Sequence, residues 1–279
     1  ILAAHTVFST VSLNMSLLLV FIVLRHTPHS FSTFGIMLKF HALIDLFVAF
    51  ASSASLQRII PMNWTMAIIS YGSCQYLGST ACYASFVAFT SAEACSLYHV
   101  LGSFVFRLLV IRGKSPSTSH AIGLICAIAL PLPIINAVGI YTILFIFSKL
   151  HEEATTTFIH GFLDIRSLSV SVPFLIHVVY CWPFYAVLLY VRNLILTKLE
   201  QASATFSEKS KVLQRKLVTM LSAQATLPLV QLYCIASSIL ELCDVIRAPV
   251  IETSSTLVAG TTAFLSPMIC LYSIDHYRR

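Results

Sequence analysis

The sequence predicts an all-α membrane protein, a bundle of seven transmembrane helices with the N-terminus outside the cell and the C-terminus inside. Only 10% of the 279 residues are charged and 57% are hydrophobic, whereas a soluble domain carries about 25% charged residues. The mean hydropathy of +0.86 agrees with this composition. Because so few charges cannot cover a water-facing surface, most of the chain must face lipid or itself.

Seven apolar runs are each long enough to cross a bilayer as a helix. We expect these helices over residues 2–24, 34–56, 78–111, 121–143, 168–196, 217–240 and 250–273. The first, fourth and sixth runs hold no charged residue, and the second and third each hold one acid, Asp45 and Glu93. No run alternates as a barrel strand would, which favours helices.

Prolines within these runs lead us to expect kinked helices, because neighbouring groups can satisfy the freed carbonyl in a membrane bundle. They are Pro131, Pro133, Pro173, Pro183, Pro228 and Pro267. The chain forms one domain in this interpretation. Since it begins at Ile1 rather than methionine, we expect it to be a fragment that lacks the extreme termini.

The distribution of basic residues predicts the orientation. With the N-terminus outside, most of the 17 lysines and arginines face the cytoplasm, and the exceptions are Arg58, Lys149, Arg166 and Arg247. This bias follows the positive-inside rule. The glycosylation sequon at Asn63 lies between the second and third helices, on the predicted outer side.

Four stretches of sequence, spread over nearly the whole chain, resemble one receptor family. They are FHALIDLF (40–47), FVFRLLVIRGKSPS (104–117), KLVTMLSAQATLPLV (216–230) and FLSPMICLYSIDHYRR (264–279). With the basic loop before the sixth helix, the chain resembles a G-protein-coupled receptor. In detail it resembles the nematode chemoreceptors of the Str superfamily, and most of all serpentine receptor class delta (Srd).

This resemblance implies a chemoreceptor of the plasma membrane, placed in sensory cilia. It would bind a small external ligand, volatile or lipophilic, and activate a heterotrimeric G protein. Membrane lipid is a further partner, because the basic inner face attracts anionic headgroups. The resemblance implies no enzyme activity, no cofactor, no metal and no nucleic-acid partner.

The resemblance implies that Arg107, at the inner end of the third helix, contacts the G protein and joins helices three and six. An arginine that snorkels to the interface is the alternative. Other basic residues expected on the coupling face are Arg112, Lys114, Lys211 and Arg215.

Asp45 lies midway along the second helix, where a charge costs at least about 2.5 kcal/mol. It should therefore face the bundle interior, and its position resembles the internal sodium-site acid of common receptors. Asn14, Ser266 and His41 are its expected neighbours. The alternative is a purely structural polar residue.

Gln224 and Pro228 belong to a predicted kink in the sixth helix that lets its inner end swing outward, unless the kink is passive. In the seventh helix, Ser266-Pro267 departs from the familiar Asn-Pro-x-x-Tyr pattern, because Cys270 stands where the tyrosine would be.

The resemblance places Glu93 at the depth of the ligand cavity, where it could bind a cationic or polar ligand. Pairing with another helix is the alternative. His99 and His177 are further ligand-binding candidates, although a lone histidine in a span is more often a core residue.

The eight cysteines show no CxxC pair and no metal-site spacing. Many receptors bridge a cysteine placed like Cys82 to the second external loop, but that loop has no cysteine here. Cys74 and Cys243 both lie on the predicted outer side and are a candidate pair.

A transporter or ligand-gated channel is the alternative function. Transporters often contain internal repeats with broken helices at matching positions, and none is visible in this sequence. The last helix lacks the lysine that a retinal protein needs, and no HExxH motif or P-loop indicates an enzyme.

Overall fold

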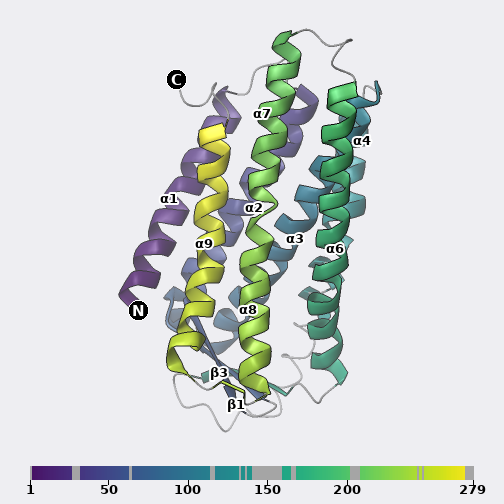
Figure 1. Ribbon diagram of the computed structural model, residues 1–279. Helices are drawn as coiled ribbons and strands as arrows, with labels where there is room; N and C mark the ends of the chain where they lie inside the picture. Colours follow the sequence, from purple (N-terminus) through teal and green to yellow (C-terminus); the bar gives the residue numbers. More distant parts are fainter. Residues whose placement is uncertain are drawn as a thin grey trace.

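The computed structural model is a bundle of long helices packed side by side, with a small sheet at one end (Figure 1). It describes residues 2–26, 32–62, 65–113, 117–131, 133–135, 137–139, 159–164, 168–201, 208–243, 245–246 and 248–273, although not every side chain within these ranges. The long helices are α1 (Leu2–His26), α2 (Ser32–Ser55), α3 (Ser79–Ile111), α6 (Leu168–Gln201), α7 (Glu208–Gln224), α8 (Leu227–Leu242) and α9 (Pro249–Ser273).

Among the described residues, three helical segments are long and apolar enough to cross a membrane: His5–Arg25, Gly35–Ser55 and Ser79–Ile111. A fourth span is possible where the short helix α4 (Thr118–Leu124) continues through the π-helix η3 (Ile125–Ala129). The segments Thr118–Ala129 and Pro133–Gly139 meet at 44°, close to the prolines for which the sequence predicts a kink.

Helix α1 exposes large apolar side chains, which a helix on the surface of a water-soluble protein would bury. Large apolar side chains such as Phe21 and Leu24 are more than half exposed, at 54% and 59%. Its buried face instead carries the serines Ser9, Ser12 and Ser16. Small residues let neighbouring helices approach closely, and exposed apolar faces suit lipid. The outer surface of α1 is therefore built to contact a bilayer.

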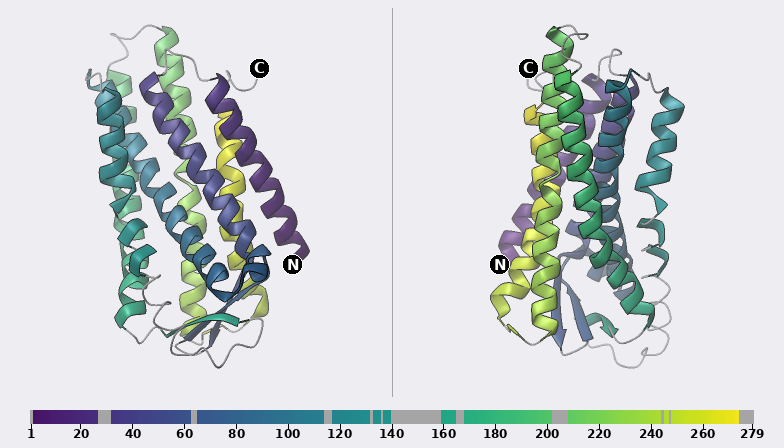
Figure 2. Two further views of the ribbon diagram at one scale, coloured as in Figure 1. Left: turned by 180° about the vertical axis from the view of Figure 1, so that it is seen from behind. Right: turned by 45° about the vertical axis from the view of Figure 1, so that its right-hand side comes forward.

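The predicted sixth helix is two helices, α7 and α8, separated by the turn at Ala225 and Thr226. Pro228 occupies the first turn of α8, where its missing N–H costs nothing. Figure 2 shows α7 and α8 following one another along the bundle. The kink expected here is thus a break just before the proline.

A three-stranded antiparallel sheet covers one end of the bundle, where the sequence analysis expected only loops. Strand β2 (Thr65–Ser70) lies between β1 (Gln57–Met62) and β3 (Ile159–Asp164). The two strands of the β1–β2 hairpin each contain a pair of isoleucines and are separated by two residues, a pattern that indicates a hairpin.

Asn63, the predicted glycosylation site, lies outside the described residues.

The structure corrects the candidate pairing of Cys74 with Cys243. Cys74 forms a disulfide with Cys82, whereas Cys243 is a free, exposed cysteine. The short 3-10 helix η2 (Ser73–Leu77) returns the chain to the start of α3, so the two cysteines are only eight residues apart in sequence. Gly72 lets this turn lie against the end of α2, because a Cβ there would be 2.1 Å from the carbonyl oxygen of Ala54.

We expect Cys82→Ser to destabilise the protein. Without the disulfide the unfolded chain gains conformational entropy. In the chain-entropy model this lowers the free energy of unfolding by about 2–3 kcal/mol for a loop of this length. The melting temperature of the purified protein should fall by several degrees in Cys74→Ser and Cys82→Ser, and remain unchanged in Cys243→Ser. A loss of stability in the Cys243 variant comparable to that of the other two would contradict this pairing.

Candidate functional site

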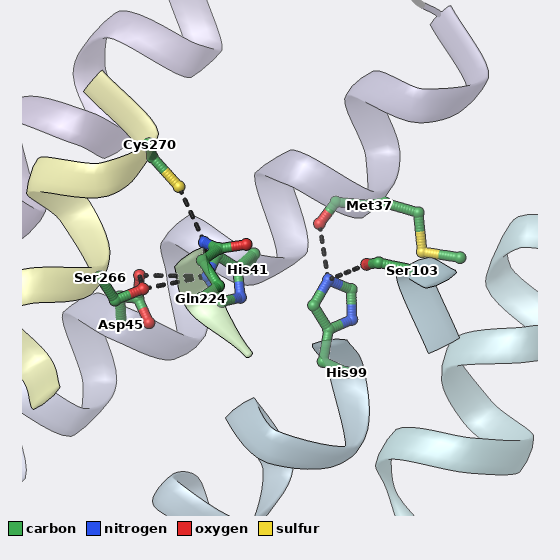
Figure 3. Close-up of polar contacts among 8 residues, drawn as sticks. All are labelled: Met37, His41, Asp45, His99, Ser103, Gln224, Ser266 and Cys270. Carbon is green, nitrogen blue, oxygen red and sulfur yellow. Dashed lines mark hydrogen bonds and ion pairs between the residues drawn. The ribbon is translucent and has the colours of Figure 1, made fainter. Parts of the chain in front are cut away.

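A cluster of buried polar side chains joins three helices in the middle of the bundle (Figure 3). Helix α2 contributes His41 and Asp45, α9 contributes Ser266 and Cys270, and α7 contributes its last residue, Gln224. All five are less than 5% exposed. We refer to these five residues as the central polar cluster.

Asp45 is held by groups from two helices. The Ser266 hydroxyl donates a hydrogen bond of 2.7 Å to the Asp45 carboxylate, whose oxygen also lies 3.5 Å from His41 Nε2. His41 Nε2 is 3.1 Å from the Ser266 oxygen. A buried carboxylate needs such partners, since leaving it without them costs far more than the bonds gain. The expectation that His41 and Ser266 neighbour Asp45 is met.

Gln224 connects the end of α7 to both neighbouring helices. Its side-chain nitrogen lies 2.6 Å from His41 Nε2 on α2 and 3.1 Å from the Cys270 sulfur on α9. The tautomer of His41 sets the direction of the first contact. The residue that follows Gln224 begins the turn between α7 and α8, so the cluster contacts α7 at its last residue.

The structure separates Asn14 from this cluster, which corrects the expectation for that residue. The Asn14 side chain is exposed and donates a 2.8 Å hydrogen bond to the backbone oxygen of Thr10, one turn earlier in α1. Its amide is therefore satisfied within its own helix. The buried face of α1 contains Ser9, Ser12 and Ser16, together with Leu19 and Val23, but not Asn14.

His99 of α3 lies beside the central polar cluster. Its ring stacks on that of His41 with centroids 5.4 Å apart. Its Nε2 atom is 3.0 Å from the backbone oxygen of Met37 and 3.3 Å from the Ser103 hydroxyl. Sequence reasoning missed Ser103, although its spacing of four residues from His99 places both on one helix face.

Glu93 pairs with another helix, as its alternative interpretation holds. Thr262 of α9 donates a 2.8 Å hydrogen bond to the Glu93 carboxylate, and both residues are buried. They line a cavity of about 30 Å³ that Asp45 and Gln224 also border. Since one water needs about 10–15 Å³ by this measure, the cavity accommodates one or two waters but no organic molecule.

Three arginines of the predicted coupling face, Arg107, Arg112 and Arg215, lie towards the end of the bundle opposite the sheet. Arg107 is 4% exposed, so the alternative of a snorkelling side chain does not describe it. Arg112 follows the last turn of α3 and Arg215 lies on α7, and both are exposed. Lys114 lies outside the described residues.

The helices are described at His177, Lys211 and Pro228, but the side chains of these three residues are outside the described part of the chain.

A second cavity, of about 100 Å³, lies among α1, α2, α3, α8 and β1. No sequence motif marks this cavity, because its lining comes from α1, from the junction of α2 with β1, from α3 and from α8. It is the larger of the two cavities described.

The chain is similar to one protein family over nearly its whole length. Residues 2–279 match the family described as serpentine type 7TM GPCR chemoreceptor Srd. Relatives from Caenorhabditis elegans include serpentine receptor class delta-1, 25% identical over 95% of this chain and 75% of the relative. Serpentine receptor class delta-18 is 24% identical over 99% of this chain and 85% of its own length.

We expect Ser266→Ala to lower stability, because Asp45 loses its hydroxyl donor. An unsatisfied buried group costs about 1–3 kcal/mol, and more when it is charged. The measurement is the melting temperature of the purified protein. Ser16→Ala is the matched control: its hydroxyl is also buried but has no hydrogen-bond partner among the described residues, so its loss should cost little. Equal melting temperatures for the two variants would show that the Ser266 bond contributes nothing.

Proposed function

Because the chain belongs to the Srd family of serpentine seven-transmembrane chemoreceptors, we propose that it detects a small external molecule within its helix bundle and activates a heterotrimeric G protein. Membership confirms the predicted family and the seven-transmembrane helical fold class, and makes the chain a multi-pass membrane receptor rather than an enzyme. In the proposal it acts at the plasma membrane, including that of sensory cilia, with no cofactor.

We propose that the sheet end of the bundle faces outside. The Cys74–Cys82 disulfide lies at that end, and disulfides persist in oxidising compartments such as the cell exterior. Helix α1 begins towards the same end, and α9 finishes towards the opposite one (Figure 1). This supports the orientation inferred from the basic residues, with the N-terminus outside and the C-terminus inside.

The observation that carries the proposal is the position of Gln224. It is the last residue of α7 and lies within contact of α2 and α9, directly before the break that separates α7 from α8. A helix broken at this point can move its inner half with little change in the outer half. Signalling requires a two-state element of this kind. In the proposal, the central polar cluster holds α7 in the inactive position, and a ligand that weakens the cluster releases it.

The inner end of the bundle would then bind the G protein. Arg107 is buried among the helices at that end, and Arg112 and Arg215 are exposed nearby on α3 and α7. Outward movement of α7 would expose Arg107 to the G protein. Arg112 and Arg215, which are already exposed, would contact the G protein beside it. Lys114 and Lys211, from the same inner segments of sequence, complete the proposed coupling face.

We expect Arg107→Ala to reduce ligand-dependent G-protein activation at least about tenfold, equivalent to about 1.4 kcal/mol. The receptor would be expressed in cultured cells with a G-protein reporter and challenged with a panel of small organic molecules. Arg25→Ala is the control, because Arg25 is exposed at the inner end of α1 and outside the proposed coupling face. Surface expression is measured for each variant.

A ligand-dependent current or uptake that persists without any G protein would overturn this function in favour of a channel or transporter.

We expect Gln224→Leu to raise signalling in the absence of ligand. Losing a hydrogen bond of about 1 kcal/mol from one of two states shifts their equilibrium about fivefold. The measurement is basal reporter activity per receptor at the cell surface. Gln201→Leu, at the exposed end of α6, is the matched control and should leave basal activity unchanged. Basal activity that stays unchanged or falls in Gln224→Leu would contradict the proposal that the central polar cluster holds α7 in the inactive position.

A further inference from the structure

The 100 Å³ cavity near the sheet has the features of a binding site for a small molecule. It lies in the half of the bundle that contains the sheet and is lined by residues of α1, α2, α3, α8 and β1. Phe86, Phe89 and Ile59 supply an apolar wall. The polar part of the lining comprises His5, Ser52, Ser55, Gln57, Thr90 and Ser238. An apolar cavity with a few convergent polar groups is the usual form of a ligand site.

The hydroxyl groups at this cavity present acceptors rather than donors. Ser55 donates to the backbone oxygen of Ala51 at 2.9 Å, and Thr90 donates to that of Phe86 at 3.1 Å. Ser238 donates to the backbone oxygen of Cys234 at 2.9 Å. Because each hydroxyl has a single proton and two lone pairs, these three residues have only acceptor capacity left for a guest.

Gln57 supplies a donor. Its side-chain nitrogen is shielded from solvent and has no hydrogen-bond partner among the residues that the structure describes. A buried amide in this state is costly until a partner satisfies it. An oxygen atom of a guest in the cavity would be such a partner. The Gln57 amide and the oxygens of Ser55, Thr90 and Ser238 thus offer a donor and several acceptors, which match the lone pairs and the single donor of one hydroxyl group.

The charge and the volume of the cavity limit the guest further. No aspartate, glutamate, lysine or arginine is among its described lining residues, and His5 is the one titratable imidazole there. An ionised guest would therefore lose its hydration without a permanent counter-charge. A cavity of about 150 Å³ is known to hold benzene, and this one is about 100 Å³. The guest is therefore neutral and no larger than about six heavy atoms.

We propose that this cavity binds a small uncharged molecule that carries one hydroxyl group on a short hydrocarbon chain. The inference deepens the proposed function, on which it rests for its role in signalling, by naming a site and a ligand class. The hydroxyl group lies between Gln57 and the oxygens of Ser55, Thr90 and Ser238. The hydrocarbon chain packs against Phe86 and Phe89.

The test measures binding directly, without a G protein. The purified chain in phosphatidylcholine nanodiscs is titrated with the straight-chain 1-alkanols from ethanol to 1-octanol, and saturation-transfer NMR detects the bound alcohol. Affinity should be saturable and greatest at 1-butanol or 1-pentanol. Partitioning into lipid increases steadily with chain length, so an affinity that rises throughout to 1-octanol would overturn the inference. Short carboxylates, which are ionised at neutral pH, should not compete.

Two variants locate the site. Thr90→Val keeps the shape of the side chain but removes the acceptor, and should weaken binding about twofold to tenfold. Ser238→Leu fills the cavity and should abolish binding. Thr10→Val is the matched control, since Thr10 is exposed and makes the same hydrogen bond to the residue four positions earlier. Equal affinities in Thr90→Val and Thr10→Val would overturn the inference.

The binding and signalling assays separate this inference from the proposed function. Alcohol binding that is sensitive to Thr90→Val but causes no G-protein activation would support the site and count against the receptor function. G-protein activation by other molecules, with no saturable alcohol binding, would support the receptor function and overturn the site.

Discussion

The Asp45 carboxylate, buried at the middle of a bundle whose outer surface suits lipid, is the constraint on which much of this structure depends. Water cannot reach it freely, so the protein itself must supply its hydrogen-bond donors. Ser266 does so from the far end of the sequence, and His41 lies one turn away on the same helix. The need to satisfy one group therefore fixes the positions of α2 and α9 relative to one another.

The same constraint extends to α7 through His41. Once His41 is held beside Asp45, its ring is within reach of Gln224, and Gln224 in turn reaches Cys270. Hydrogen bonds in such a network polarise and support one another in a low-dielectric interior. A change in the hydrogen bonds of one member therefore alters the strength of the hydrogen bonds made by the others. A cluster of this kind, located where a helix is already broken, is well suited to convert a small local change into movement of a whole helix segment.

Composition and hydropathy were enough to predict the membrane bundle, because the shortage of charge leaves no soluble alternative. The cost of a charge within lipid likewise placed Asp45 in the interior, and the resemblance of its position to the internal sodium-site acid of common receptors suggested Ser266 and His41 as its neighbours. The error over Asn14 arose because depth in the membrane says nothing about which side of a helix a residue occupies. Asn14 satisfies its own amide against Thr10 and faces outward.

Other features depend on contacts that a single sequence does not display. The Cys74–Cys82 bridge requires the tight turn of η2, which no pattern in the sequence indicated, and Cys243 was therefore the candidate partner of Cys74. The sheet requires β3, which is distant in sequence from β1 and β2. The two cavities are bordered by side chains from four or more segments, none of which forms a motif by itself.

The distance between the inner ends of α1 and α7 tests the central claim most directly. Spin labels at Arg25 and Val212, both exposed, would report this distance by double electron–electron resonance after the exposed free cysteines Cys126 and Cys243 are replaced. The account predicts that Gln224→Leu adds a population with α7 farther from α1, absent in Gln201→Leu. Identical distance distributions in the two variants would contradict the claim that the central polar cluster holds α7 in place.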